Sequence, residues 1–168
     1  RLRINYVYKM TYVGAYVNKE GISVLTDSQG TMGDRKDDRC QKLFVVGNNL
    51  LFGTGWSDIL HGVASSLHNK IGYDDTSIED AQKYLMQSSG EFAGERQTNV
   101  YICGAGKDGY KAYGVMIGPS LKAGQVDRFV PDGSGAMFVV EAITRDMSKG
   151  IDHMLYDSIE ESSSFLYD

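Results

Sequence analysis

The sequence predicts an α+β fold in which pairs of helices cover a sandwich of sheets. Short β-prone runs come first and two segments with helical spacing follow, and this order of strands and then helices is repeated in the second half of the chain. A strict alternation of strand and helix is absent, which argues against a doubly wound nucleotide-binding fold. The 168 residues and 42% apolar content suffice for one domain with one core.

The first four predicted strands form two hairpins. Each hairpin has two β-prone runs around a polar turn: residues 12–17 and 22–26 around 18–21, and residues 43–46 and 50–52 around 47–49. Gly21 can supply a positive φ to the first turn. Gly47 and the two asparagines that follow it suit left-handed conformations in the second.

Two helices are predicted next. Ser57 can cap the first, and Asp58 in its first turn suits the positive end of the helix dipole. Its apolar residues follow helical spacing: Ile59, Leu60, Val63, Ala64 and Leu67. After a break at residues 72–75, Ser77 opens the second helix. The apolar side of that helix consists of Ile78, Ala81, Tyr84 and Leu85.

The second half of the chain repeats the pattern. Strands are predicted at residues 98–103, 110–117 and near 125–130, and helical stretches at 136 to about 143 and from 150 toward 165. Residues 131–135 form the turn that leads into the later helical stretch.

Residues 104–109 match the pattern G-x-G-x-x-G, and Asp127 lies downstream. A dinucleotide-binding motif of this kind must open a helix. The residues after Gly109 alternate like a strand instead, so a hairpin turn is the favoured interpretation.

Composition excludes several classes of function. A net charge of -5 and a pI near 5.2 argue against nucleic-acid binding, which normally shows as a basic excess. The chain contains no apolar run long enough for a membrane span and no secretory signal. Only two cysteines occur and neither lies in a CxxC or other metal-type spacing, which favours a reduced, cytoplasmic setting.

No metal or cofactor site is predicted. Cys40 and Cys103 lack metal-type spacing, and no carboxylate or thiol completes a recognised ligand set with His61, His68 or His153. The absence of a G-x-S-x-G elbow gives a serine hydrolase little support.

Thr11, Asp27 and Lys42 follow one another in the order hydroxyl, carboxylate, ammonium. A threonine hydroxyl is a poor nucleophile at neutral pH and needs a base and a positive field beside it. A strand, a turn at residues 26–33 and a second strand could bring the three groups together. Taken alone, Asp27 and Lys42 would be a surface charge and a solvated lysine.

The stretch from Thr11 to Lys42, with Asp27-Ser-Gln-Gly-Thr-Met-Gly33 between, resembles the opening of proteasome β subunits and of the related HslV peptidase. The spacing from Thr11 to Asp27 agrees with this family without a gap, and Lys42 needs one residue fewer in the loop before it. Three further positions also match: Gly21, Thr31 and Gly33.

Two later segments strengthen the resemblance. Residues 52–58 resemble the turn that supplies the family's oxyanion-binding amide, with Gly55 the preferred match and Gly53 the alternative. Gly133-Ser134-Gly135 resembles the Gly-Ser-Gly whose serine hydrogen-bonds around the amine of the nucleophile.

The resemblance implies a four-layer αββα sandwich of the N-terminal nucleophile hydrolase type over residues 11–168. It implies a threonine endopeptidase in which Thr11 attacks, its α-amine acts as base, Asp27 holds Lys42, and Ser134 orients the amine. It also implies a homo-oligomeric or hetero-oligomeric ring in the cytoplasm that acts on peptides or unfolded proteins, with an ATP-dependent unfoldase as a candidate partner and no cofactor.

The sequence departs from the family at its end. The family's last two strands are missing, so a C-terminal truncation is expected. The family's aspartate near the end of the last helix has Asp168 as its nearest candidate, whereas gapless continuation points to Phe165.

Residues 1–10 precede the nucleophile and are interpreted as a pro-segment, a tag or an N-terminal arm. The mechanism needs the Met10–Thr11 bond to be cut, since an amide nitrogen cannot act as a base. Met10 as initiator, a self-cleaving precursor (a zymogen) and an unprocessed subunit all remain open. Two alternative functions follow: a peptide ligase or transpeptidase on the same site, and an inactive structural ring subunit.

Overall fold

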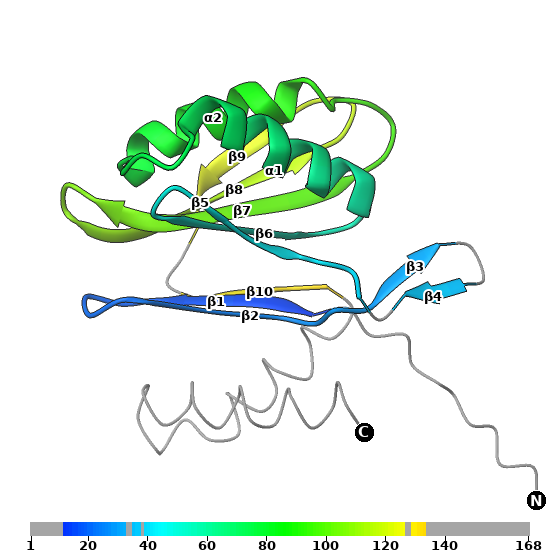
Figure 1. Cartoon of the computed structure of the whole chain (residues 1–168), viewed down its shortest axis with the longest axis horizontal. Coiled ribbons are helices and arrows are strands. Elements are labelled where there is room, and N and C mark those ends of the chain that lie inside the picture. The colour runs from blue at the N-terminus through cyan, green and yellow to red at the C-terminus, as the bar shows by residue number, and fades with distance from the viewer. Residues whose placement is uncertain (1–11, 33–34, 38, 127–128, 134–168) are drawn as a thin grey trace, which may run out of the picture.

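The computed structural model describes residues 12–32, 35–37, 39–126 and 129–133. These residues form three layers: two helices, a five-stranded antiparallel sheet beneath them, and a three-stranded antiparallel sheet on the far side (Figure 1). This part of the chain is thus a mixed α and β fold, in agreement with the predicted α+β class. The helical stretches predicted at 136–143 and 150–165 lie outside the described residues.

The three-stranded sheet carries the beginning of the chain's described part. Its order is β10-β1-β2, with β10 (Phe129–Asp132), β1 (Val13–Val17) and β2 (Ile22–Thr26). The predicted hairpin of β1 and β2 is therefore confirmed. The odd-numbered side chains of β1 are buried against Phe52, Cys103 and Ala112 of the larger sheet, because side chains alternate between the two faces of a strand.

The turn between β1 and β2 forms without the positive φ predicted for Gly21. The Asn18 side chain closes it instead, because its Oδ1 accepts hydrogen bonds from the amides of Glu20 at 2.8 Å and Gly21 at 2.9 Å. The Asn18 amide also donates to the Gly21 carbonyl at 3.0 Å. An asparagine that bonds to its own turn in this way provides the closure that a left-handed glycine would otherwise give.

A short hairpin follows β2 where only a turn was predicted for residues 26–33. β3 (Gly30–Met32) pairs with β4 (Arg35–Asp37) in a separate two-stranded sheet, which extends past the end of the two main sheets (Figure 1). The segment lacks the apolar alternation by which strands are recognised in a sequence. The hairpin is identified by its backbone pairing.

The five-stranded sheet has the order β5-β6-β7-β8-β9. Its strands are β5 (Leu43–Val46), β6 (Asn49–Thr54), β7 (Thr98–Gly106), β8 (Gly109–Ile117) and β9 (Lys122–Gln125). The predicted hairpin of β5 and β6 is confirmed, with Gly47 at φ 59° in its turn. Residues 104–109 form the hairpin of β7 and β8 and not a helix start, so the hairpin interpretation of the G-x-G-x-x-G pattern is confirmed.

The single strand predicted near residues 125–130 is wrong. This stretch contains the end of β9, which belongs to the five-stranded sheet, and the start of β10, which belongs to the three-stranded sheet. The chain therefore crosses from one sheet to the other between Gln125 and Phe129. Because both sheets offer an edge to an incoming strand, local residue pattern does not reveal which sheet a strand joins.

α1 (Ser57–Ile71) and α2 (Ile78–Gly90) cover one face of the five-stranded sheet (Figure 1). All five apolar residues predicted for the inner face of α1 are buried. On α2, Ile78, Ala81 and Leu85 are buried, but Tyr84 is 37% exposed and lies at the edge of that face. Within the described ranges, both α1 and α2 fall short of the length and apolar character of a membrane-spanning helix.

The two helices begin differently. Ser77 caps α2 as predicted, because its hydroxyl accepts a hydrogen bond from the Asp80 amide at 3.3 Å. Ser57 does not cap α1: it is already the first helical residue, and Trp56 holds the N-cap position without a side-chain bond. The cap prediction for Ser57 was therefore wrong by one residue, a common uncertainty at helix ends.

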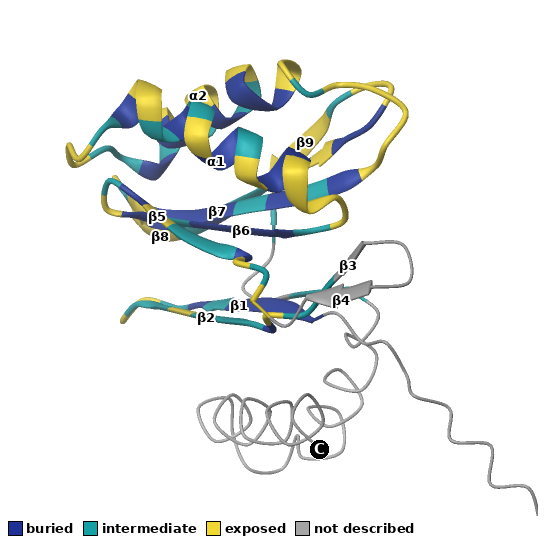
Figure 2. Ribbon diagram, turned by 45° about the vertical axis from the view of Figure 1, so that its right-hand side comes forward, coloured by how far each residue is buried: buried dark blue, intermediate teal, exposed yellow. Residues whose placement is uncertain are grey.

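Two apolar cores hold the layers together (Figure 2). One lies between the helices and the five-stranded sheet and contains Leu51, Leu67 and Ile102. The other lies between the two sheets and contains Val13 and Phe52. The helices and the two sheets thus pack as a helix–sheet–sheet stack.

Candidate active site

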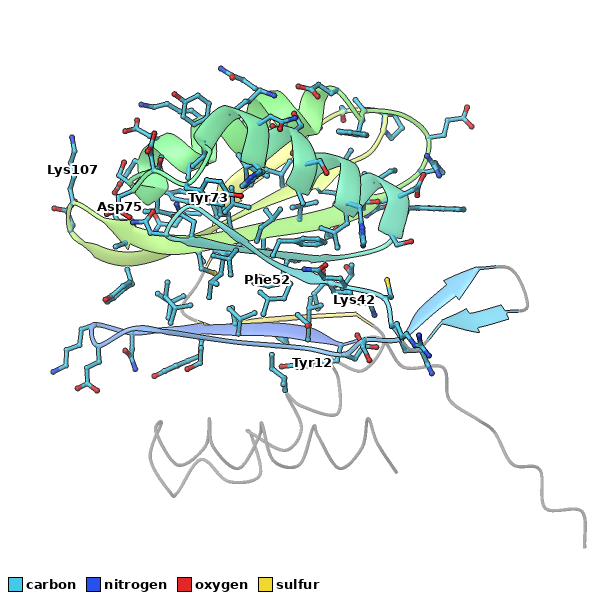
Figure 3. All side chains as sticks on the ribbon, in the orientation of Figure 1. Tyr12, Lys42, Phe52, Tyr73, Asp75 and Lys107 are labelled. Atoms are coloured by element: carbon cyan, nitrogen blue, oxygen red, sulfur yellow. The ribbon has the colours of Figure 1, made fainter. Side chains whose placement is uncertain are left out.

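Asp27 and Lys42 form a buried ion pair at one end of the two sheets. Lys42 Nζ lies 2.6 Å from Asp27 Oδ1, and the two side chains are 8% and 5% exposed. Asp27 follows the last residue of β2, and Lys42 precedes the first residue of β5. The pair therefore joins the three-stranded sheet to the five-stranded one, and Figure 3 shows Lys42 directed into the space between them.

The same carboxylate is tied to the start of β1. The amide of Tyr12 donates to Asp27 Oδ1 at 3.3 Å, and the amide of Asp27 donates to the Tyr12 carbonyl at 2.9 Å. Asp27 Oδ2 accepts from the Gln29 amide at 3.3 Å. The Tyr12 amide is one side of the peptide bond to Thr11, so the ion pair is fixed next to the point where the chain reaches that residue. Thr11 itself lies outside the described residues.

A buried ion pair is weak evidence for stability. Removing two charges from water costs several kcal/mol per ion in real proteins, and apolar residues of similar size are often as stable or more so. The inter-sheet core offers such apolar surroundings in Phe52 and Leu43. The Asp27–Lys42 pair is therefore not, by itself, an argument for the stability of the fold.

Gly55 and Gly53 occupy different surroundings. Gly55 lies just beyond the end of β6 at φ 109°, and a Cβ on it would come within 2.7 Å of the Gln97 carbonyl oxygen. Both features require glycine. Within the described residues its amide donates to no hydrogen-bond partner. Gly53 lies inside the ladder opposite Val100, and a Cβ there would strike the Asn99 carbonyl.

Asp132 forms a second polar junction between the sheets, one that the sequence did not reveal. Its Oδ2 accepts hydrogen bonds from the Tyr101 hydroxyl at 2.6 Å, Thr54 Oγ1 at 2.9 Å and Asn99 Nδ2 at 3.0 Å. Its Oδ1 accepts from the Gly133 amide at 2.6 Å. These donors come from β6, β7 and the residue after β10, so no local pattern connects them.

The surroundings of Asp132 favour its charged form. Burial acts to raise the pKa of Asp132, but the hydrogen bonds from Tyr101, Asn99, Gly133 and Thr54 together bring it below the ordinary aspartate value. Burial, and then the bond to Asp132, raise the pKa of Tyr101. At neutral pH this junction is therefore a carboxylate that accepts from a neutral phenol.

The pairing of β1 with β10 leads toward two predicted site residues. Val13 lies opposite Asp132, and the described strands end there. Thr11 is two residues before Val13, and Ser134 is two residues after Asp132. Gly133 next to Ser134 has φ 94°. Ser134, like Gly33, Phe165 and Asp168, lies outside the described residues.

The histidines that the structure describes have structural partners. His61 Nε2 lies 3.0 Å from the Gln41 carbonyl oxygen, and its ring meets Phe44 edge-on. His68 meets the ring of Tyr73. Over the described ranges, no group of three or more potential ligands is placed to hold a metal ion. His153 lies outside those ranges.

Two open cavities flank the inter-sheet region. One, of about 260 Å³, has Asn99 and Tyr101 in its wall. The other, of about 360 Å³, lies at the tips of the β1–β2 and β7–β8 hairpins. Neither of these two cavities is lined by Asp27 or Lys42.

No protein-family model matches this chain, and no curated protein matches it. The geometry of Asp27, Lys42, Gly55 and Asp132 therefore carries the functional interpretation.

Proposed function

We propose that this protein is a threonine-type endopeptidase in which Thr11 acts as an N-terminal nucleophile once residues 1–10 are removed. The observation that carries the proposal is the buried Asp27–Lys42 ion pair, fixed to the Tyr12 amide beside Thr11. A hydroxyl nucleophile needs a fixed positive field, and a desolvated ammonium supplies a stronger one than a solvated lysine.

The proposed fold is the four-layer αββα sandwich of the N-terminal nucleophile hydrolases. The helix layer and the two packed antiparallel sheets are compatible with it and would be three of its layers. In that arrangement the nucleophile stands at the start of a strand whose sheet packs against the other sheet. β1 fits this position, since its odd-numbered side chains face the five-stranded sheet.

Acylation would proceed by attack of Thr11 Oγ on a peptide carbonyl carbon. The α-amine of Thr11, oriented by Ser134, takes the hydroxyl proton and then returns it to the departing amine of the substrate. Lys42, held by Asp27, stabilises the developing alkoxide. The amide of Gly55, which has no hydrogen-bond partner in the described part of the chain, is suited to bind the oxyanion, a contribution of about 3 to 4 kcal/mol. Water, which gives a proton to the α-amine, then attacks the ester carbonyl carbon. The bond from that carbon to Thr11 Oγ breaks, Oγ takes the proton back, and the second product leaves as a carboxylic acid.

This chemistry requires Thr11 to carry a free amine. In the uncut chain the Thr11 nitrogen belongs to the amide of Met10, whose lone pair is delocalised and cannot accept the proton. Residues 1–10 would therefore keep the protein inactive, and their removal would activate it. A ring of subunits that admits peptides or unfolded proteins, supplied by an ATP-dependent unfoldase, is proposed as the cytoplasmic setting.

The decisive experiment compares a protein whose first residue is Thr11 with one that retains residues 1–10. Fluorogenic peptides should be hydrolysed only by the first, and a hydroxyl-reactive peptide epoxyketone should label Thr11 only there, as mapped by mass spectrometry. Intact mass must be recorded for both, because cutting of Met10–Thr11 during the assay would make the second form active. Native mass spectrometry of the active form tests the ring.

Two matched variants complete the test. Thr11→Ser keeps a hydroxyl and should retain part of the activity, whereas Thr11→Ala should lose turnover by at least about 1,000-fold with the same far-UV spectrum. Equal activity in the protein that retains an intact Met10–Thr11 bond, or in Thr11→Ala, would overturn the proposal.

A further inference from the structure

Asp132 is the one described carboxylate that accepts hydrogen bonds from both of the strands β6 and β7 while it belongs to the opposite sheet. We infer that Asp132 is a positioning residue of the proposed threonine site, holding the turn at Gly55 and the segment that leads to Ser134 at a fixed distance from each other. This inference rests on the proposed function.

The first step concerns the Gly55 side. Thr54 is the last residue of β6, immediately before Gly55, and its hydroxyl donates to Asp132 Oδ2 at 2.9 Å. On the other side of Gly55, the Trp56 amide donates to Thr98 Oγ1 at 3.2 Å. The proposed oxyanion donor thus lies between two residues that are each fixed by a side-chain hydrogen bond.

The second step concerns the Ser134 side. Asp132 Oδ1 accepts from the Gly133 amide at 2.6 Å, so it is bonded to the Asp132–Gly133 peptide unit, one residue before Ser134. Across the ladder, Asp132 lies opposite Val13, two residues after Thr11. The Asp132 carboxylate is therefore bonded to the neighbours of two proposed groups, Gly55 and Ser134, and Asp132 itself is paired with the strand that begins near the third.

The third step is the character of the bonds. Hydrogen bonds to a carboxylate are shorter and stronger than neutral ones, and they are directional, unlike apolar packing. Asn99 gives its amide nitrogen to Asp132 and leaves its Oδ1 buried without a partner in the described part of the chain. Such an arrangement costs stability, and a role in alignment explains why it is kept.

The test uses the protein that begins at Thr11. Asp132→Asn keeps the size of the side chain but places an amide nitrogen among donors. We expect kcat for peptide hydrolysis to fall about 10- to 100-fold, because displacements near 1 Å cost about this much, while KM changes less than about threefold. Thr54→Val removes only the bond beside Gly55 and should lower kcat about 3- to 10-fold.

A cycle with Ser134→Ala separates alignment from general destabilisation. If Asp132 acts through the Ser134 segment, Asp132→Asn should cost much less in the Ser134→Ala protein than in the parent. The inference would be overturned if the two substitutions lowered kcat independently, so that the double variant lost the product of the two single losses. It would also be overturned if the loss of kcat followed the loss of folded protein in thermal unfolding. Should Asp132→Asn not fold, Thr54→Val decides, and an unchanged kcat in that variant would overturn it.

Glu91→Gln is the matched control. The Glu91 carboxylate accepts from Ser66 at 2.9 Å and from Lys70 at 2.6 Å in the helix layer, so it is a comparable polar junction outside the proposed site. Its kcat should equal that of the parent. An inactive parent with Thr11 free overturns the proposed function and this inference with it, whereas an active parent with normal kcat in Asp132→Asn overturns this inference alone.

Discussion

Lys42 keeps an ammonium group at the junction of the two sheets, with 8% of its side chain exposed. Such a charge is tolerated only beside a counter-charge, and Asp27 provides it at 2.6 Å. The sequence marked both residues through a resemblance, but it gave no sign that they are buried. Burial is what turns two ordinary charges into a fixed local field.

Lys42→Met tests the energetic role of the pair. It leaves Asp27 buried without its counter-charge, so we expect the free energy of unfolding in urea to fall by about 3 to 5 kcal/mol. Combining Lys42→Met with Asp27→Asn removes both charges and should recover a large part of this loss. Neither variant should hydrolyse peptides, even when its Thr11 carries a free amine, because both lack the Lys42 ammonium.

The double variant distinguishes a role of Lys42 in folding from a role in hydrolysis. Recovered stability together with recovered hydrolysis would show that Lys42 serves the fold alone. No recovery of stability would show that the Tyr12 and Gln29 amides, which also bond to Asp27, require its charge. Melting curves of both variants beside the parent distinguish these results.

At the level of single elements, local chemistry decided most boundaries. Ser77 caps α2, and Gly47 takes the left-handed conformation in the β5–β6 turn. Two local predictions were wrong. Asn18 closes the first turn in place of a left-handed Gly21, and Trp56 precedes α1 in place of Ser57.

The two serines near the helix starts give a matched pair of variants. Ser77→Ala should lower the free energy of unfolding by about 1 kcal/mol, since it removes the bond to the Asp80 amide. Ser57→Ala should change it by less than about 0.5 kcal/mol, because Ser57 is exposed and makes no cap bond. Urea unfolding followed by circular dichroism measures both. Equal losses would contradict the assignment of the caps.

At the scale of the whole molecule, an apolar core and two polar junctions hold the sheets together. The core contains Val13 and Phe52, and the junctions centre on Asp27 and Asp132. Both junctions lie toward the end of β1 that leads to Thr11, since Asp27 bonds to Tyr12 and Asp132 lies opposite Val13. The directional contacts are thus gathered where the proposed chemistry requires alignment.

Acid should weaken the Asp132 junction. The folded-state pKa of Asp132 is below its ordinary value near 3.8, so its charged form stabilises the fold above that pH, and this contribution is lost as the pH falls further. The difference in free energy of unfolding between the parent and Asp132→Asn should therefore be constant above about pH 5 and shrink below about pH 4. A difference that grows in acid would contradict the direction of the pKa shift.

Some segments of the fold could be predicted from the sequence and others could not. The burial of Leu67 on α1 follows from spacing, because a period of 3.6 places apolar side chains on one face of a helix. The β3–β4 hairpin was not predictable, because its sequence shows no apolar period. The change of sheet between β9 and β10 was not predictable either, because a strand pairs with segments that are distant in the sequence.

The sequence by itself determined the apolar faces of the two helices, the hairpin at residues 104–109 and the candidacy of Asp27 and Lys42. Only the tertiary structure decided that these two side chains meet at 2.6 Å out of solvent, and that Asp132 gathers Thr54, Asn99 and Tyr101. The physical reason is range. Periodicity and capping act within a few residues, whereas burial and convergence of charge arise only when segments distant in the chain are packed together.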